Sequence, residues 1–365
     1  MIRVKVSTSS PHVPHIKMTP GSTGVVGNFQ FFIDKEVPEV DWWVVADNFP
    51  KKESVVCPKE NTILITQETE VVKKYNPKYV NQFNWVITSQ QSLNHPRQIF
   101  TQQAHQSYLF LRRRRPDESI EDYKNQFRSF DDLRVMTEKD IPKSKILTTN
   151  VSQKLRMQGA IDRHDFIMKL KKHFGDKFDI FSNKVEDPKQ NVFGPDAKST
   201  TYKWDALAPY KYAISIENSY APHWWTSHLF DAFLAGAYPF FYGHPSIFDY
   251  FPKNSLTLID INDAEGSIAI IEKAISENYF EKYKKEIWEA RKLILEKYYL
   301  FAMLAEQIAK LPPSKSKPKL ITLSPEQKPW LKRKIVETLR GKGLLYTVPR
   351  KIYRIYRKAR YGEIR

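Results

Sequence analysis

The apolar positions of this chain fall into short runs separated by polar loops, a pattern typical of α/β proteins. Strands are predicted at residues 2–7, 41–47, 54–57 and 62–66. The run at residues 41–47 is mostly apolar with polar ends, which indicates a buried strand. The first part of the chain is therefore predicted to be an α/β domain.

A second series of strands and helices begins after a predicted linker at residues 141–144. A strand at residues 146–149 precedes a helix that starts near Ile161, has apolar residues at helical spacing and ends at the C-cap glycine Gly175. The expected divisions are an α/β domain at residues 1–143, a second α/β domain at residues 144–311, and a linker with a basic tail at residues 312–365.

The most informative segment spans residues 209–243. Its buried strand, residues 213–216, ends in Glu217 and Asn218, and a short loop then leads to a helix that closes with Gly236. Polar groups at the carboxyl end of a strand, facing the amino end of a helix, are how α/β proteins hold a nucleotide phosphate. The segment therefore predicts a nucleotide site.

This segment resembles the donor-site signature of the α-1,3-fucosyltransferase family, glycosyltransferase family 10. The matching positions are Tyr210, Lys211, Tyr212, Ile216, Glu217, Asn218, Ser219, Thr226, Ala232, Gly236, Pro239 and Gly243. A thinner resemblance runs through residues 63–69, 79–87 and 146–150. It implies a GT-B-like α/β fold, in which two Rossmann-like domains face a central cleft and the second domain binds the nucleotide-sugar.

The resemblance also implies a reaction. The expected activity is the inverting transfer of a 6-deoxyhexose, most simply L-fucose from GDP-fucose, to a hydroxyl of a cell-surface or lipopolysaccharide-type glycan. Arginine, a helix dipole and backbone groups handle the donor in such enzymes, so we expect no metal cofactor. The nine histidines are scattered along the chain and show no metal-binding spacing.

Two residues upstream of the segment have roles that the resemblance implies. Glu68 is the candidate general base, which takes the proton of the acceptor hydroxyl; Glu70 competes for this role, and an ordinary surface glutamate is the alternative. Arg163, near the start of a helix, is the candidate phosphate ligand, because a guanidinium can grip a diphosphate through two parallel hydrogen bonds. Arg156 is the competing match, and a solvated helix-end arginine is the alternative.

Within the segment, further residues are candidate donor ligands. Asn218 and Thr226 frame the donor loop, and Thr226 is also expected to cap the helix that follows. Glu217 is expected either to hold a sugar hydroxyl or to orient the loop. Trp224, with Trp225, offers a stacking face for the base or the sugar, and packing within the loop is the alternative for both.

Ser227 and His228 depart from the family signature, which has Glu-Lys at these positions. In the family the Glu holds the ribose hydroxyls and the Lys holds phosphate. A serine cannot accept from two hydroxyls as a carboxylate can, and an imidazole replaces the lysine charge only when it is protonated. A different nucleotide-sugar donor, for example a dTDP-sugar, is therefore one alternative. A non-catalytic, membrane-associated glycan-binding protein is another.

The composition of the chain bears on its expected cellular location. The 365 residues include one cysteine, Cys57, which excludes an internal disulfide. No apolar run reaches the roughly 18 residues that would suggest a transmembrane helix. The first residues alternate charged and apolar side chains and lack the continuous apolar core of a signal peptide. A reducing, bacterial cytoplasm is the expected location.

The positive charge is concentrated at the end of the chain. Residues 311–365 hold 16 Lys or Arg and 3 Asp or Glu, so they carry +13 of the net charge of +17. Because the main body is nearly neutral, a nucleic-acid partner is not expected. An apolar helical face near residues 352–359 is flanked by Arg350, Lys351, Arg354, Arg357 and Lys358. Such a helix can lie on an anionic membrane, which predicts peripheral association with the inner face of the cell membrane; a solvated tail and RNA binding are the alternatives.

Overall fold

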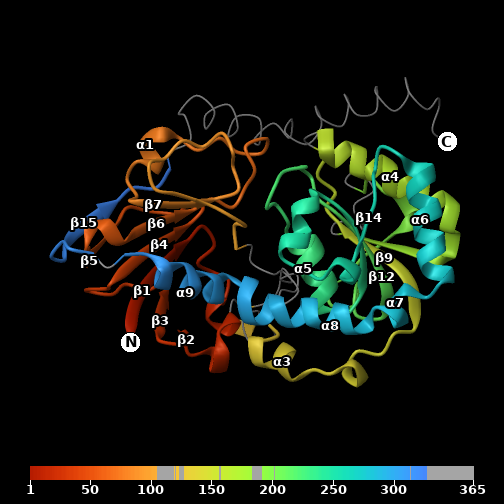
Figure 1. Cartoon of the computed structure of the whole chain (residues 1–365), viewed down its shortest axis with the longest axis horizontal. Coiled ribbons are helices and arrows are strands. Elements are labelled where there is room, and N and C mark those ends of the chain that lie inside the picture. Colours follow the sequence, from red (N-terminus) through yellow and green to blue (C-terminus); the bar gives the residue numbers. More distant parts are fainter. Residues whose placement is uncertain are drawn as a thin grey trace.

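The computed structural model describes residues 1–104, 119, 121–122, 127–155, 158–182, 191–200, 202–312 and 314–326. Two α/β domains lie side by side, the first drawn in red and orange and the second mainly in green and cyan (Figure 1). Short 3-10 helices are found at His15–Met18, Pro20–Ser22, Lys59–Asn61, Glu138–Asp140, Gly175–Lys177, Gly194–Asp196, Pro245–Asp249 and Lys253–Ser255.

The first domain is built on a sheet with the strand order β2-β3-β1-β4-β6-β7-β8. These strands are β1 (Ile2–Thr8), β2 (Val25–Val26), β3 (Phe29–Ile33), β4 (Trp42–Ala46), β6 (Thr62–Ile65), β7 (Trp85–Thr88) and β8 (Gln98–Phe100). All neighbours run parallel except β2 and β3. Alternate residues of β4 enter different cores, since Trp42 and Val44 pack on one side of the sheet and Trp43 and Val45 on the other.

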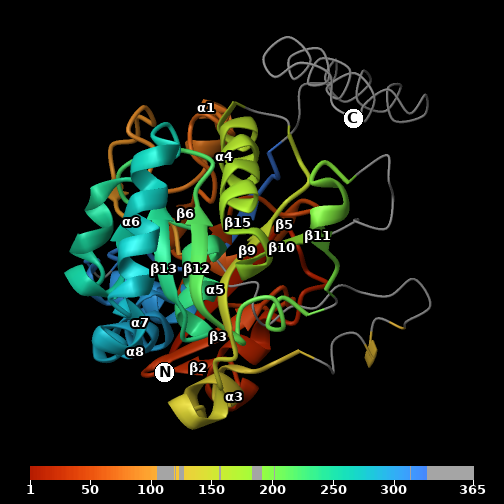
Figure 2. The same ribbon diagram turned by 90° about the vertical axis from the view of Figure 1, so that its right-hand side faces the viewer.

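The second domain is built on a parallel sheet with the order β11-β10-β9-β12-β13-β14. Its strands are β9 (Lys145–Val151), β10 (Phe178–Ser182), β11 (Ala197–Lys198), β12 (Tyr210–Ile216), β13 (Tyr238–Tyr242) and β14 (Thr257–Leu258). Helices α4 (Gln158–Phe174) and α6 (Ala264–Ser276) lie on one side of the sheet, and α5 (Ser227–Leu234) and α8 (Lys284–Leu293) lie on the other (Figures 1 and 2). Gly175 follows α4 with a φ of +55°, as expected for a C-cap glycine.

The helical region at the end of the second domain is divided. Helix α7 (Tyr279–Lys282) directly precedes α8, and α8 runs into a π-helical turn at Ile294–Tyr298, whereas the short helix α3 (Phe130–Val135) comes before β9. Tyr299 is extended, and α9 (Leu300–Lys310) then packs on the first domain, where the Phe301 ring lies 5.2 Å from that of Phe31. None of the described helices is both long and apolar enough to span a bilayer.

The C-terminal segment differs from its prediction. Residues 312–365 were expected to form a linker and a basic tail, but β15 (Lys319–Leu323) pairs antiparallel with β5 (Glu53–Cys57) of the first domain. Leu323 is buried in the same core as Trp43, close to the short helix α1 (Pro77–Val80). An apolar strand pairing across such a long sequence separation has no local signal, which is why the pattern did not reveal it.

The loops that follow the strands of both sheets meet between the domains. The hydroxyls of Thr69, beyond β6, and Ser219, beyond β12, are hydrogen-bonded at 2.8 Å. The amide of Gln103, beyond β8, donates to the carbonyl oxygen of Trp225 at 3.0 Å. The carboxyl edges of the two parallel sheets therefore face each other, and the predicted GT-B-like arrangement is confirmed.

Candidate active site

Strands β9 and β12 lie side by side at the centre of the second sheet, and the chain leaves them in opposite directions. β10 and β11 extend the sheet beyond β9, whereas β13 and β14 extend it beyond β12. In an open α/β sheet, ligands bind outside the carboxyl ends of the strands at such a switch point. The segments that begin there lead to α4 and α5, so the residues predicted for the donor converge on this place.

Glu217 is the first residue after β12, and its side chain is buried, with 1% exposure. Thr226 holds both carboxylate oxygens, because its backbone N–H donates to Oε1 at 2.7 Å and its hydroxyl donates to Oε2 at 2.8 Å. Thr226 also caps α5, since its Oγ1 accepts from the backbone N–H of His228 at 3.3 Å. These contacts favour the loop-orienting role for Glu217.

The environment of Glu217 sets its charge near neutral pH. Burial raises the pKa of this carboxyl to about 7, while the hydrogen bonds from Thr226 and the positive charges of Arg163 and Lys203 lower it. The unfolded chain would lose this proton at a lower pH, so between about pH 4.5 and 7 the folded state binds more protons than the unfolded state. The contribution of Glu217 to stability must therefore decrease as pH rises through this window.

Replacing Glu217 with Gln is expected to make stability less dependent on pH. The amide keeps an acceptor for the Thr226 N–H but carries no charge. Between pH 5 and pH 8 the free energy of unfolding of the variant should therefore rise by on the order of 3 kcal/mol relative to that of the wild type. Urea unfolding at both pH values measures this difference. A constant offset between variant and wild type would contradict the buried, titrating carboxyl.

Arg163 and His228 meet at the end of β12. Arg163 projects from the second turn of α4 and is 6% exposed. Its Nη1 lies 3.4 Å from the carbonyl oxygen of Ile216, to which it donates, and 3.2 Å from Nε2 of His228. A guanidinium only donates, so His228 accepts through Nε2 and its ring carries a proton on Nδ1. Within the described part of the chain, the hydrogen bonds of Arg163 are made by Nη1, which leaves its Nε and Nη2 edge for an anionic ligand.

The start of α4 lies directly against the donor loop. A Cβ atom on Gly159 would be 2.3 Å from the backbone carbonyl oxygen of Asn218, far inside van der Waals contact. Only glycine allows this approach, which brings the first turn of the helix next to the carboxyl end of β12. Asn218 itself is half-buried. The sequence analysis missed Gly159, although a glycine in the first turn after a strand is the signal that could have revealed it.

Lys203 is another residue that the sequence analysis missed. Its ammonium group lies 3.4 Å from the hydroxyl of Ser227 and forms an ion pair with Asp231, one turn further along α5. Asp231 is fully buried. A lysine from a separate loop therefore brings a cation to the start of α5, where His228 stands in place of the lysine of the family signature. No local pattern around Lys203 indicates this position.

Both tryptophans of the donor loop are buried. Trp224 is 3% exposed and Trp225 is 1% exposed. The Trp225 ring stacks on Phe230 of α5 with a centroid distance of 4.6 Å and lies edge-on to Phe251 at 4.9 Å. A ring packed in this way offers no face to a base or sugar, so the structure favours the packing alternative over the predicted stacking role.

Glu68 lies just beyond β6 (Thr62–Ile65), in the first domain. Burial raises the pKa of its carboxyl to about 7, the charge of Asp47 adds to this rise, and Lys73 and Lys154 oppose it. Lys154 belongs to the loop after β9 in the second domain, so Glu68 faces the donor side. The competing carboxylate, Glu70, is already bound by the backbone N–H and hydroxyl of Ser92 at 3.2 and 2.9 Å. The geometry therefore favours Glu68 over Glu70 as a base.

Several predicted residues lie outside the part of the chain that the structure describes. They are Arg156, Arg350, Lys351, Arg354, Arg357 and Lys358. Among the residues that are described, no group of three or more His, Cys, Asp or Glu side chains is arranged to hold a metal ion.

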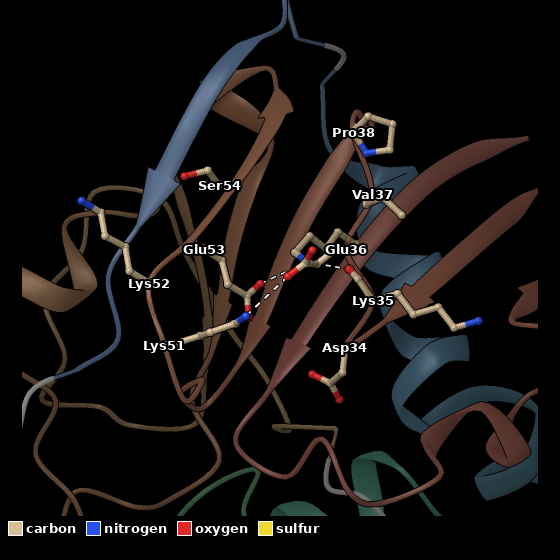
Figure 3. A pocket seen from close by; sticks show the side chains of 10 residues that line it. Asp34, Lys35, Glu36, Val37, Pro38, Lys51, Lys52, Glu53 and Ser54 are labelled. Atoms are coloured by element: carbon tan, nitrogen blue, oxygen red, sulfur yellow. Dashed lines mark hydrogen bonds and ion pairs between the residues drawn. The ribbon is translucent and has the colours of Figure 1, made fainter.

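A pocket of about 600 Å³ on the first domain is separate from these residues (Figure 3). It lies between the turn after β3 and the start of β5, and none of the candidate residues lines it. Lys5 pairs there with Glu53 at 3.1 Å, and Lys51 pairs with Glu36 at 3.4 Å. These paired charges make the pocket a poor match for a diphosphate, so it does not compete with the switch point of the second sheet.

Comparison with known proteins confirms the predicted similarity to α-1,3-fucosyltransferases. The chain is 25% identical over 157 residues to alpha-(1,3)-fucosyltransferase B of Drosophila melanogaster, a match that covers 40% of this chain and 34% of that protein. The chain thus matches about a third of the length of this curated relative. No family model matches the chain.

Three solved structures resemble this chain at low sequence identity. An alpha1,3-fucosyltransferase with GDP is 13% identical, with a TM-score of 0.45 and coverage of 82% of this chain and 92% of that chain. Anabaena HepE in complex with UDP-glucose is 8% identical, with a TM-score of 0.44 and coverage of 85% and 100%. A glycosyltransferase from Rickettsia africae is 8% identical, with a TM-score of 0.46 and coverage of 84% and 96%.

Proposed function

We infer that this chain is a glycosyltransferase related to the α-1,3-fucosyltransferases. We propose that it transfers a 6-deoxyhexose, most simply L-fucose from GDP-fucose, with inversion to a hydroxyl of a cell-surface or lipopolysaccharide-type glycan. The observation that carries this proposal is that the loop bearing the half-buried carboxyl of Glu68 contacts the donor loop, which lies next to the Arg163 and His228 cluster. The direct contact between Thr69 and Ser219 links the loops that bear the two halves.

The proposed chemistry follows from this arrangement. The acceptor hydroxyl oxygen forms a bond to the anomeric carbon of the donor, while Glu68 takes the hydroxyl proton. The bond between the anomeric carbon and the diphosphate oxygen breaks on the opposite face, so the configuration inverts. Arg163 and the backbone N–H groups at the starts of α4 and α5 would stabilise the charge that develops on the departing nucleotide. The donor is a co-substrate, and the proposal requires no metal.

A different nucleotide-sugar is the second candidate donor. Ser227 offers one hydroxyl, which lies 3.4 Å from the ammonium nitrogen of Lys203. A single hydroxyl is poorly suited to binding two ribose hydroxyls. A donor with deoxyribose, such as a dTDP-sugar, therefore fits Ser227 better than a donor with ribose does.

A thermal-shift panel separates the donors. The purified protein is heated with GDP, GDP-fucose, UDP, dTDP and CMP, and with the matched nucleotide-sugars. A ligand at about 100 times its dissociation constant stabilises the folded state by about 2.7 kcal/mol, which raises the Tm by several degrees. We expect GDP and GDP-fucose to give the largest shift. A shift with dTDP alone would support the second candidate, and no shift with any nucleotide would contradict the proposed function.

We also propose that the basic tail holds the enzyme on the anionic inner face of the cell membrane, next to a lipid-linked acceptor. Changing Arg350, Lys351, Arg354, Arg357 and Lys358 to Gln should weaken binding to vesicles that contain anionic lipid by at least about 100-fold, because each cation near the surface contributes about 1 kcal/mol. Vesicle sedimentation measures this, with neutral vesicles as the control. Equal binding by the variant and the wild type would contradict the proposal. A deletion of the tail that also removes β15 is a poorer test, because β15 pairs with β5 and its loss would disturb the first domain.

A further inference from the structure

The segment that follows β15 returns to the loop that bears the candidate base. The backbone N–H of Glu326 donates to Oδ1 of Asn48 at 2.9 Å, and Oε1 of Glu326 accepts from the backbone N–H of Asn76 at 2.7 Å. Ser324 exchanges two hydrogen bonds with the amide of Gln82, at 2.8 and 3.1 Å. A short stretch near the end of the described chain is thus fixed to the first domain beside β4 and the loop after β6.

Glu326 also forms an ion pair with Lys73, which lies on the same loop as Glu68. Its Oε2 lies 3.0 Å from the ammonium nitrogen of Lys73, and the same nitrogen lies 2.7 Å from Oδ1 of Asp47. The side chains of Lys73, Asp47 and Glu326 are 25%, 21% and 12% exposed. One lysine is therefore held between two carboxylates that come from distant parts of the chain, in a place where water screens their charges poorly.

Two further side chains, those of Tyr75 and Gln90, connect this ion pair to Glu68. The hydroxyl of Tyr75 donates to Asp47 and accepts from the backbone N–H of Gln67 at 3.0 Å, next to Glu68. The amide of Gln90 donates to the backbone carbonyl oxygens of both Glu68 and Lys73, at 2.7 and 2.9 Å. Gln90 thus binds the backbone of both Glu68 and Lys73, and Tyr75 joins Asp47 to the residue that precedes Glu68.

The charges that face Glu68 come from three elements. Among the described residues, Asp47 follows β4, Lys73 belongs to the same loop as Glu68, and Lys154 follows β9. The phenol of Tyr75 is coupled to Glu68 as well. Asp47 raises the pKa of the Glu68 carboxyl, whereas Lys73 and Lys154 lower it. If Lys73 moved away, Glu68 would lose a stabilising cation and would face a less neutralised Asp47.

We propose that Glu326 is a positioning residue for the transfer reaction, which holds Lys73 against Asp47 and so fixes the charge around the base Glu68. The inference rests on the proposed function, in which Glu68 accepts the proton of the acceptor hydroxyl. Glu326 touches neither substrate nor the reacting atoms in this scheme. It acts through Lys73, and the C-terminal segment thereby becomes part of the active-site support.

The test is the pH dependence of kcat for the full-length Glu326→Gln variant. In the wild type, activity should rise with pH around a midpoint near 7, as Glu68 ionises. Without Glu326, Lys73 loses one of its two anchors and turns more freely into water, which leaves Asp47 less neutralised beside Glu68. Because the loss of the Glu326 charge alone would lower the midpoint, a rise by about one pH unit reports the displacement of Lys73. Near pH 7 this shift lowers kcat about fivefold, and KM for the donor should stay unchanged. The matched control is Glu36→Gln, which removes a carboxylate paired with Lys51 elsewhere in the first domain.

A direct titration keeps this test separate from the proposed function. The ¹³C-carboxyl signal of Glu68, assigned by its loss in Glu68→Gln, reports the ionisation of Glu68 with or without turnover. A midpoint that rises in Glu326→Gln, but not in Glu36→Gln, supports the positioning role. An unshifted Glu68 titration, or a kcat that falls equally at every pH, would overturn it. A wild type that titrates as expected but transfers no sugar would instead overturn the proposed function.

Discussion

Glu68→Gln is expected to lower kcat about 10³-fold without changing the affinity for the donor. General base catalysis contributes typically 10² to 10⁴ in rate, and the amide cannot take a proton from the acceptor hydroxyl. Because burial and Asp47 raise the pKa of Glu68 to about 7, the residual activity of the variant should also lose the rise with pH that the wild type shows near neutrality. Steady-state kinetics between pH 5.5 and 8.5, together with donor titration, measure both effects.

Glu70→Gln is the matched control for this experiment. Glu70 lies on the same loop, but Ser92 already binds its carboxylate, so its loss should change kcat little. Full activity in Glu68→Gln, or a larger loss in Glu70→Gln, would show that the base is assigned to the wrong carboxylate.

Arg163→Met is expected to weaken donor binding about 100-fold and to destabilise the fold by about 3 kcal/mol. The first effect follows from the loss of a buried, charged hydrogen-bond donor to the diphosphate. The second follows because Met removes the buried hydrogen bond to the carbonyl oxygen of Ile216 and a nearby cation that favours the ionised form of the buried Glu217. Calorimetric titration with the nucleotide and urea unfolding measure the two effects separately.

The double variant Arg163→Met/Glu217→Gln separates stability from binding. It should recover most of the lost stability, since no buried charge is left unpaired, but it should still bind the nucleotide weakly. Arg134→Met, which removes an exposed arginine of α3, is the control and should affect neither property. Nucleotide affinity that returns with stability in the double variant would mean that Arg163 is structural and does not contact the donor.

The second domain was predicted well because its signals are local. The strand at residues 213–216 lies within β12, Thr226 caps α5, and Gly175 ends α4, as expected from the residue types and their spacing. The convergence of Arg163 with His228 also follows from local order, since each residue lies near the start of a helix that follows a central strand. In a parallel sheet, the carboxyl ends of adjacent strands bring such residues together.

Other features depend on contacts that no local pattern encodes. The pairing of β15 with β5 and the approach of Lys203 to α5 join residues far apart in the sequence. The burial of Trp225 results from packing against Phe230 and Phe251, and a tryptophan in a loop sequence looks the same whether it faces a ligand or a core. The break at Tyr299 interrupts a continuous helical pattern and turns α9 onto the first domain, which only tertiary packing decides.

The most direct test of the central claim is a measurement of sugar transfer. The full-length protein is incubated with GDP-fucose and a panel of glycan acceptors, in parallel with the other nucleotide-sugars that stabilise it. Mass spectrometry detects the product, and NMR gives the configuration at its anomeric carbon. We expect transfer of one 6-deoxyhexose with inverted configuration, and the loss of that product in Glu68→Gln. A retained configuration would contradict the proposed mechanism, and the absence of both transfer and donor hydrolysis with every nucleotide-sugar would contradict the assignment as a glycosyltransferase.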